Sequence, residues 1–480
     1  MTSDGPAAHP PMRALQRELL GIATPLILST ASFTIMHFID RVMLAWYSDV
    51  TAAASVCGGI LSFMFISFFM GVAEYTNTFV AQYHGAGDRR MCAVSVWQGV
   101  YVSLISSVLL IGLKPVGLWV ITLFNHEAAV QEAERAFFSI MLSGGVWLLL
   151  SCALSTFFSG RGDTWTVMWV NCGTSLLNGV LNYVLIFGHW GAPRLGIRGS
   201  GYATVISLAT ATATYTALIL RRRWRVEYGI LRHWAFRPSS FMQLVRFGGP
   251  SGISFGLDIA AFTVFVLIMG IYGTVSLIAS NITLAINMLA FMPMLGCSIA
   301  TSIMVGQYIG RNDKRTAERA AYAGLRLTVG YMAFMGILFV AVPRLFFLCF
   351  KGEGIAPDTF EQVVAYGRIL LAFLAVMGVL DAVNTTFSGA LKGAGDTWFT
   401  MWAQVALAWG VFVPPVCLML LVFKLGIFWA WAWLVVYVAC LAAVFAWRFR
   451  RGAWKTIELR ETITPAVMPE LAEEARPIEG

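Results

Sequence analysis

The chain has 480 residues, of which 58% are hydrophobic and 12% are charged, and its net charge is +8. Because ordinary soluble domains carry about 25% charged residues, this composition excludes a soluble globule and predicts an integral membrane protein. The 33 Lys and Arg residues are dispersed along the chain, a pattern that disfavours nucleic-acid binding and suits contact with anionic membrane lipids.

Twelve apolar segments of about 20 residues, the length of helix that crosses a bilayer, follow one another along the chain. They lie near 19–42, 52–80, 93–113, 134–158, 165–187, 199–220, 244–270, 276–304, 320–343, 365–388, 398–422 and 427–447. Continuous apolar runs of this length exclude a transmembrane β-barrel. We therefore expect an all-α integral membrane protein with twelve transmembrane helices.

Two stretches of the first half recur in the second half. Gly162–Trp169 matches Gly395–Trp402 at six of eight positions, at an offset of 233, and Val80–Arg90 corresponds to Val305–Arg315 at an offset of 225. Internal repeats in an apolar chain are typical of transporters, whose substrate path lies between the repeats. The sequence thus predicts two homologous six-helix lobes.

The domain boundaries follow from these repeats. We expect an N-lobe over 1–230, part of a cytoplasmic linker over 231–243, a C-lobe over 244–460, and a disordered acidic tail over 461–480. Most basic residues, from Arg13 to the block that begins at Arg221 and the tail from Arg448, fall on one side of the predicted helices. By the positive-inside rule both termini are cytoplasmic, which predicts a multi-pass protein of the cell inner membrane.

The sequence shows no motif for catalysis or cofactor binding. The eight cysteines lie singly and the histidines are scattered, without the paired spacings of zinc, haem or redox sites. A phosphate-binding GxxxxGK[ST] loop is absent from the sequence, and this disfavours an ATP-driven pump. A membrane-embedded hydrolase would need a nucleophile with its base or a metal cluster, and the sequence does not indicate either. We expect a non-enzyme without a cofactor.

Acidic residues inside apolar helices are the leading candidates for function, because burying one costs on the order of 3 kcal/mol. The four such residues are Asp40, Glu74, Asp258 and Asp381. Asp163 and Asp396, by contrast, fall in the repeated turns and are predicted to cap helices or tie loops.

Several motifs together resemble the multidrug and toxic compound extrusion (MATE) family, in its NorM-like branch. They are the paired loops Gly85–Asp88 and Gly310–Asp313, the paired segments Ser159–Thr164 and Ala390–Thr397, and the single segments Leu177–Gly188 and Leu195–Thr204. The resemblance covers residues 13 to 455. It implies a V-shaped molecule of two six-helix lobes, an exporter of amphipathic, often cationic drugs and toxins in exchange for protons or sodium ions.

The resemblance also implies site residues. In the family, the N-lobe cation site consists of an Asp of helix 1, two Asn of helix 5 and a Thr of helix 6. The matching residues in this sequence are Asp40, Asn178, Asn182 and Thr204, and Ser200 precedes Thr204 by one turn. Some proton-coupled members carry Asp where Asn182 stands, so H+ and Na+ both remain candidate coupling ions.

In the C-lobe, the NorM-type acids of helices 7 and 10 are matched by Asp258 and Asp381. Glu74 matches no family role and is a candidate additional buried acid. The only metal that the sequence suggests is sodium, at the N-lobe or the C-lobe site.

The residues themselves support the N-lobe site. Asn178 and Asn182 are four apart, so they share one helix face and can present two carbonyl oxygens to one point. With a carboxylate and a hydroxyl they form an all-oxygen site for a hard cation, or a cage for a protonated Asp. Ion binding would neutralise Asp40 and could bend helix 1 at a hinge near Pro25.

Each site residue has a structural alternative. Asp40 could pair with Arg41 at the membrane edge, the C-lobe acids could pair with polar neighbours such as Asn384, and the two asparagines could be helix-packing contacts. Glu74 could be a structural hydrogen-bonding acid.

Two alternatives to a multidrug exporter remain. One is a lipid-linked precursor or polysaccharide flippase of the same superfamily, and the other is a major facilitator porter. The expected partners are small-molecule drugs and membrane lipids, and the expected state is a monomer.

Overall fold

The computed structural model describes residues 10–123, 126–269, 274–350, 357–457 and 459. The predicted acidic tail over 461–480 lies outside the described residues. Long helices make up most of the described chain, joined by short turns, as expected where every backbone polar group must be satisfied away from water.

Each predicted spanning segment corresponds to a described helix or to a composite of helical pieces. The first half comprises α1 (Met12–Tyr47), α2 (Asp49–Gly85), α3 (Arg89–Leu123), α4 (Ala128–Ser159), α5 (Thr164–Phe187) and α6 (Ile197–Ile219). The second comprises α8 (Pro238–Met269), α9 (Thr274–Gly310), α10 (Lys314–Ala341), α12 (Pro357–Ala394), α13 (Thr397–Ala406) with its continuation, and α15 (Ile427–Arg451). Short helices are η1 (His189–Gly191), α7 (Arg222–Glu227), α11 (Pro343–Leu348) and η5 (Ala453–Thr456).

Within the described residues, eleven helical segments are long and apolar enough to cross a membrane, and α8, with 32 residues, is the twelfth long helix. The predicted all-α, twelve-helix architecture is confirmed.

The predicted helix near 398–422 is interrupted. It starts as α13 and continues through a π-helical segment, η3 (Leu407–Phe412), a short α14 (Val413–Cys417) and a second π-helical segment, η4 (Leu418–Val422). Pro414 and Pro415 lie within α14. Because proline offers no N–H and clashes with the preceding turn, the backbone widens around the pair, and such π segments are frequent at functional sites.

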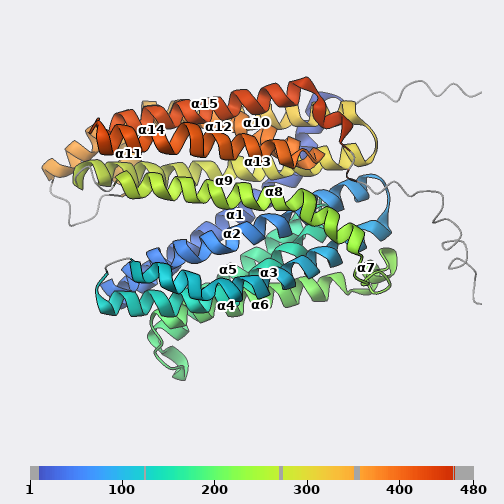
Figure 1. The fold of residues 1–480 in the computed structure, drawn as a ribbon, viewed down its shortest axis with the longest axis horizontal. Coiled ribbons are helices and arrows are strands. Elements are labelled where there is room, and N and C mark those ends of the chain that lie inside the picture. Colours follow the sequence, from blue (N-terminus) through green and yellow to red (C-terminus); the bar gives the residue numbers. More distant parts are fainter. Residues whose placement is uncertain (1–9, 124–125, 270–273, 351–356, 458, 460–480) are drawn as a thin grey trace, which may run out of the picture.

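Figure 1 shows two helix bundles that cross at one end of the molecule and separate toward the other. The crossing is an exchange of helix ends. Leu19 of α1 is fully buried in the hydrophobic core of the second bundle, and Leu244 of α8 is buried in a core of the first bundle. These two residues are 225 positions apart, the offset of the sequence repeat, so the exchange is reciprocal.

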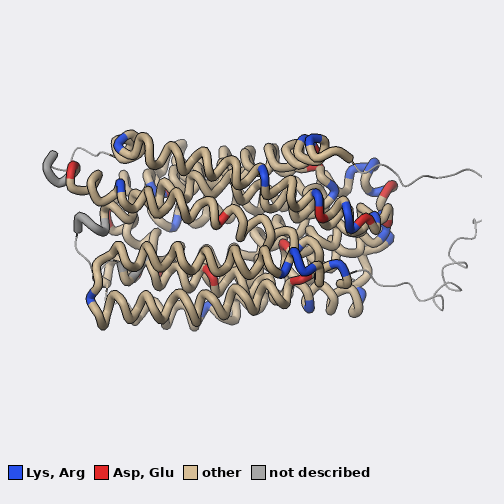
Figure 2. Tube along the Cα trace, turned by 90° about the horizontal axis from the view of Figure 1, so that it is seen from above, with Lys and Arg blue, Asp and Glu red and all other residues tan. Residues whose placement is uncertain are grey.

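Basic residues gather at the end of the molecule where α1 begins and α15 ends (Figure 2). We call it the basic end. Its residues include Arg89, Arg90, Arg221, Arg222, Arg223, Arg225, Arg311, Lys314, Arg315, Arg448, Arg450 and Arg451. The asymmetry matches the sequence-based grouping of these residues on one side of the helices.

Backbone contacts between α2 and α9 hold the bundles together at the basic end. A Cβ placed on Gly85 would lie 2.7 Å from the carbonyl carbon of Gln307, and one on Gly310 would lie 2.8 Å from that of Gln82. No real side chain fits at such distances. Glycine at both positions therefore permits the two helices to touch, and the two contacts are related by the 225-residue offset.

Two glutamines reinforce this contact with a second reciprocal pair of hydrogen bonds. Gln82 Nε2 donates to the carbonyl of Gly393 at 3.0 Å, and Gln307 Nε2 donates to the carbonyl of Gly160 at 2.9 Å. Both acceptor glycines lie just before the repeated Gly-Asp-Thr-Trp turns. The duplicated motifs of the sequence thus meet across the interface between the bundles.

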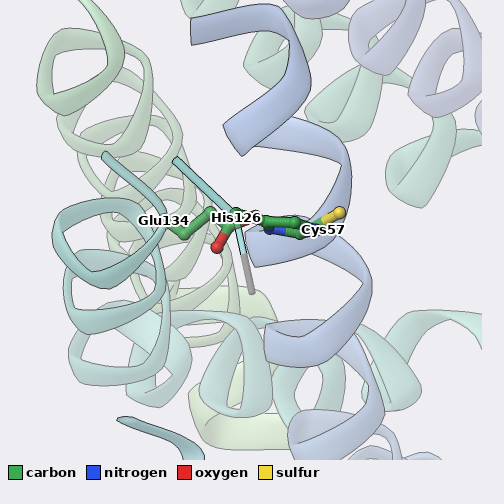
Figure 3. Close-up of side chains that lie close together, drawn as sticks. All are labelled: Cys57, His126 and Glu134. Carbon is green, nitrogen blue, oxygen red and sulfur yellow. The ribbon is translucent and has the colours of Figure 1, made fainter. Parts of the chain in front are cut away.

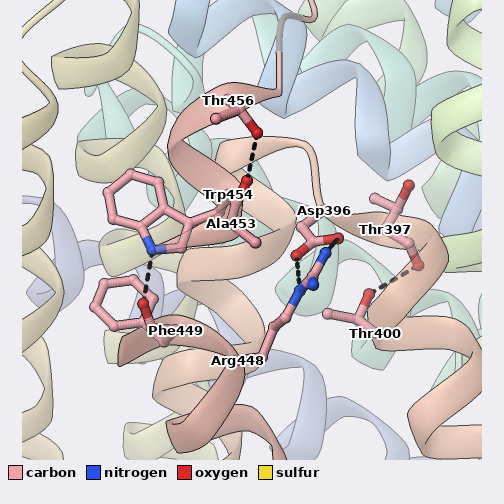
Figure 4. A network of polar contacts seen from close by, with 8 residues as sticks. All are labelled: Asp396, Thr397, Thr400, Arg448, Phe449, Ala453, Trp454 and Thr456. Carbon is pink, nitrogen blue, oxygen red and sulfur yellow. Dashed lines mark hydrogen bonds and ion pairs between the residues drawn. The ribbon is translucent and has the colours of Figure 1, made fainter. Parts of the chain in front are cut away.

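Of the acids in the repeated turns, Asp396 serves as a loop tie, in line with the sequence-based prediction, whereas Asp163 makes a local contact. Asp396 is buried and accepts hydrogen bonds from Arg448 Nε at 2.7 Å and Nη2 at 3.3 Å (Figure 4). Asp163 accepts from the hydroxyl of Thr166. The first contact joins the start of α13 to the end of α15, and the second remains within the first turn of α5.

Candidate functional site

Asp40 lies on α1, toward the end of the bundles opposite the basic end, and is 8% exposed. Its Oδ1 accepts a hydrogen bond from Nδ2 of Asn182 on the neighbouring α5. His37 Nδ1 lies 4.0 Å from the other carboxylate oxygen. The carboxylate therefore faces the interior of the first bundle rather than its edge, which argues against the alternative in which Asp40 serves only as a partner of Arg41.

Asn178 and Asn182 are both fully buried. As their spacing predicts, they lie on one face of α5, and Nδ2 of Asn182 is 2.9 Å from Oδ1 of Asn178. In the alternative amide orientation of Asn178, which exchanges its oxygen and nitrogen and so replaces this hydrogen bond, the nitrogen donates to Asp40 Oδ1 at 2.8 Å. Both amides of α5 are thus directed at one carboxylate.

The helix α6 closes the other side of this group. The side chain of Thr204 lies 3.3 Å from that of Asn178, and its hydroxyl donates to the backbone carbonyl of Ser200 at 3.1 Å. Ser200 is 2% exposed. The five residues that the sequence predicts for the N-lobe site therefore come together, although Ser200 contributes its backbone rather than its hydroxyl to the described contacts.

One oxygen of this cluster is unsatisfied. Oδ1 of Asn182 is buried and has no hydrogen-bond partner among the described residues. An unpaired buried acceptor costs about 1–3 kcal/mol, and a hard cation or a proton donor is the kind of partner that would offset this cost. The cluster offers oxygens to a cation and hydrogen-bond donors to an ionised carboxylate.

Pro25 lies inside α1, which continues without a break on both sides of it. It precedes Asp40 by 15 residues, a separation of about 22 Å along the helix. The ring is buried near the basic end, where α1 packs against the second bundle. The role of Pro25 as a hinge stays a prediction.

A second polar group lies in the C-lobe. Asn384 Nδ2 donates to Asp381 Oδ1 at 2.9 Å, while the side chains of Gln404 and Tyr437 lie beside Asp258. Asp381 and Asp258 lie within electrostatic range of each other. The structure thus places the two acids together, among amide and hydroxyl groups drawn from α8, α12, α13 and α15.

Glu74 differs from the sequence-based expectation of a buried acid, because its side chain is exposed. Cys152 Sγ of the same bundle lies 3.9 Å from its Oε1, and Lys392 of the opposite bundle lies within electrostatic range. Groups of both bundles therefore lie near the exposed side chain of Glu74.

Lys392 is a site residue that sequence reasoning missed. The structure places it within the last turns of α12, half-buried and within electrostatic range of both Glu74 and Asp258. Its signal in the sequence was the replacement of Ser159, its counterpart at the 233-residue offset, by a charged residue.

The position that corresponds to Asp40 in the second half is apolar. Phe265 occupies it at the 225-residue offset, and its ring packs 5.5 Å from Phe412 and 6.3 Å from Trp431 between centroids. An aromatic core therefore fills the place of the N-lobe polar cluster, so the two lobes share a scaffold but have different interiors.

Comparison with known proteins supports these observations. The model of the MatE family matches residues 25–184 and 250–418, so each half of the chain matches it, and the two matches begin 225 residues apart. The multidrug resistance protein NorM of Burkholderia vietnamiensis is 28% identical over 448 residues, 92% of this chain and 95% of that protein. A probable multidrug resistance protein NorM of Thermotoga maritima is 24% identical over 460 residues, which are 95% of this chain and 96% of that protein.

Solved structures share the fold. A multidrug resistance MATE family transporter in an outward-facing conformation superposes with a TM-score of 0.81 at 19% identity, over 92% of this chain and 97% of that chain. A transporter of the MOP superfamily from Pyrococcus furiosus superposes with a TM-score of 0.81 at 19% identity, over 95% of this chain and 100% of that chain.

Proposed function

Because the chain belongs to the MatE family of multi-pass membrane transporters, we propose that it is a multidrug efflux protein, one that exports amphipathic or cationic compounds by antiport with protons or sodium ions. Members of this family transport rather than catalyse. The observation that carries the proposal is the buried Asp40 carboxylate, held by two amides of α5 and lying beside an unsatisfied amide oxygen.

Coupling requires a group whose charge changes during the cycle. Asp40 is a buried acid that a proton or a sodium ion could neutralise, and the asparagines could hold it in either state, since an amide both donates and accepts. Loss of the charge would weaken the hold of α5 on α1. In this proposal, movement of α1 then links ion binding at Asp40 to the interface between the lobes.

The exposed acid between the lobes suits a cationic substrate. Glu74 is exposed on α2, and both Glu74 and Asp258 of the C-lobe lie within electrostatic range of Lys392. Lys392 partly offsets these negative charges. A lipid-linked pyrophosphate would require a predominantly basic space, so the balance of charges favours an organic cation over a flippase substrate.

The basic end suits the cytoplasmic side of a bacterial inner membrane, with both termini inside. The chain would then open outward, because the bundles meet at the basic end and separate toward the other (Figure 1). Each chain contains both lobes and a complete polar cluster, consistent with function as a monomer.

The test uses purified protein in proteoliposomes loaded with ethidium as the organic cation. A sodium gradient and a pH gradient are applied separately, and whichever drives transport identifies the coupling ion. Asp40→Asn is expected to abolish gradient-driven transport while the protein keeps its wild-type elution volume and Tm. The matched control is Asp49→Asn, an exposed acid in the first turn of α2, which should transport normally.

Two results would contradict the proposal. Wild-type transport by Asp40→Asn would remove the carboxylate from the coupling step. Absence of ethidium transport under both gradients, together with movement of a lipid-linked sugar in the same vesicles, would favour the flippase.

A further inference from the structure

Three potential metal ligands meet at the end of the N-lobe opposite the basic end. They are Cys57 of α2, His126 in the turn before α4, and Glu134 of α4, and their ligand atoms all lie within 4.8 Å of one another (Figure 3). The histidine Nδ1 is 2.9 Å from Oε1 of Glu134. None of the three residues belongs to either polar site described above.

Glu134 is the residue that makes this group unusual. It is 1% exposed, and its second carboxylate oxygen, Oε2, is buried without a hydrogen-bond partner among the described residues. A buried carboxylate is costly unless it is paired or coordinates a metal. Its contact with His126 satisfies one oxygen only, so the other is left as an open ligand position.

The backbone around the group is closely packed. A Cβ added to Gly58, the residue after Cys57, would lie 3.3 Å from the carbonyl oxygen of Glu134 and 3.4 Å from the ring of Phe137. The helices α2 and α4 therefore approach each other closely beside the three ligands. Two of the three ligands, Cys57 and Glu134, stand on these packed helices and are positioned before any ion arrives, and this lowers the cost of binding.

The donor set selects the kind of ion. A thiolate, an imidazole and a carboxylate together suit Zn2+, whereas Ca2+ and Mg2+ prefer oxygen ligands alone. Three protein ligands leave a fourth position of a tetrahedral ion for water. Cys57 is half-buried and His126 is exposed, so an ion could enter from the aqueous side.

We propose that Cys57, His126 and Glu134 form a Zn2+ site that ties α2 to α4 at the outer end of the N-lobe. The ion would satisfy Oε2 of Glu134 and join the three side chains by coordination bonds. Phe137, one turn after Glu134, packs in a cluster with Leu44 of α1 and Ile186 of α5. The proposed site therefore stabilises the end of the lobe next to the Asp40 cluster.

The test begins with full-length protein that has been treated with a chelator and then titrated with Zn2+ alone. The expected result is one high-affinity Zn2+ per chain and a rise in Tm that EDTA reverses. Cys57→Ser and Glu134→Gln should each lower the affinity at least about tenfold, since loss of even an outer-shell partner of a metal ligand costs 10–100-fold. Cys152→Ser is the matched control, because Cys152 is another half-buried cysteine but lies outside the group.

A second readout does not depend on how the variants fold. In the wild-type protein, Zn2+ should protect Cys57 from alkylation by a maleimide, as measured by mass spectrometry, and leave Cys152 unaffected. The proposal is overturned if the wild type binds no Zn2+ at the protected cysteine, or if Cys57→Ser binds as tightly as the wild type. The group would then be a hydrogen-bonded His–Glu pair beside a cysteine.

Discussion

Replacing either interface glycine by alanine should open the basic end of the molecule. At Gly85 the added methyl group would lie 2.7 Å from the carbonyl carbon of Gln307, whereas ordinary contacts of this kind begin at 3.4 Å. The carbonyl oxygen of Gln307 lies nearer still, so α2 and α9 have to separate by more than 0.7 Å, because the obstructing atoms belong to the backbone. Gly310→Ala meets the backbone of Gln82 in the same way.

The energetic effect follows from the two hydrogen bonds that span the same contact. Separation of the helices lengthens both hydrogen bonds. The first joins Gln82 Nε2 to the carbonyl oxygen of Gly393 at 3.0 Å, and the second joins Gln307 Nε2 to that of Gly160 at 2.9 Å. Each is worth about 0.5–1.5 kcal/mol net, so losing both shifts the equilibrium toward an open basic end by about 1–3 kcal/mol. That corresponds to about 5- to 150-fold in population.

Hydrogen exchange read by mass spectrometry measures this opening. Exchange of the amides in 80–90 and 305–315 should accelerate by the same 5- to 150-fold in both Gly85→Ala and Gly310→Ala, because each contact supports the other. The matched control is Gly173→Ala, at a helical glycine of α5 that has no atom within 4 Å of an added Cβ. If Gly85→Ala exchanges as slowly as this control, the glycine contact does not hold the lobes together.

Three further predictions concern stability and transport. Gly199→Ala should lower the free energy of unfolding by about 1–3 kcal/mol, since the new Cβ would lie 2.6 Å from the carbonyl carbon of Leu185; an unchanged Tm would contradict the packing. Asp396→Asn should destabilise the protein by about 1.5–3 kcal/mol, the worth of hydrogen bonds to a charged group, because it leaves the half-buried Arg448 without its carboxylate; thermal unfolding of this variant next to Asp49→Asn provides the measurement. Glu74→Gln should raise the KM for ethidium while preserving the rate of ethidium transport at saturation. An equal rise in the KM for a neutral substrate would contradict a role for the Glu74 charge.

The candidate cation site shows how far residue patterns reach. The spacing of Asn178 and Asn182 places both amides on one face of α5, and the structure contains that arrangement. That Asp40 would meet them could be expected from the family resemblance, but not from the spacing. Contact between α1 and α5 depends on how helices pack, and an apolar helix surface can accept several neighbours.

The Cys57, His126 and Glu134 group could not be predicted from the sequence. Its members are spread over 78 positions and follow no spacing that metal sites use. The exposure of Glu74 could not be predicted from the sequence either, because an acid within an apolar run can face either a packed interior or an open space. Both depend on the distance between helices that are remote in sequence.

The helices, their number and the twofold repeat could be predicted from the residues alone, because bilayer thickness fixes the length of an apolar segment and duplication leaves matching residues. The acids that are costly to bury could be located in the same way. The exchange of the ends of α1 and α8 between lobes, and the contact of Gly85 and Gly310 with the opposite backbone, became visible in the folded molecule. The reason is physical: helix formation is governed by local hydrogen bonds and burial, whereas which helices approach closely depends on side-chain volumes from all parts of the chain.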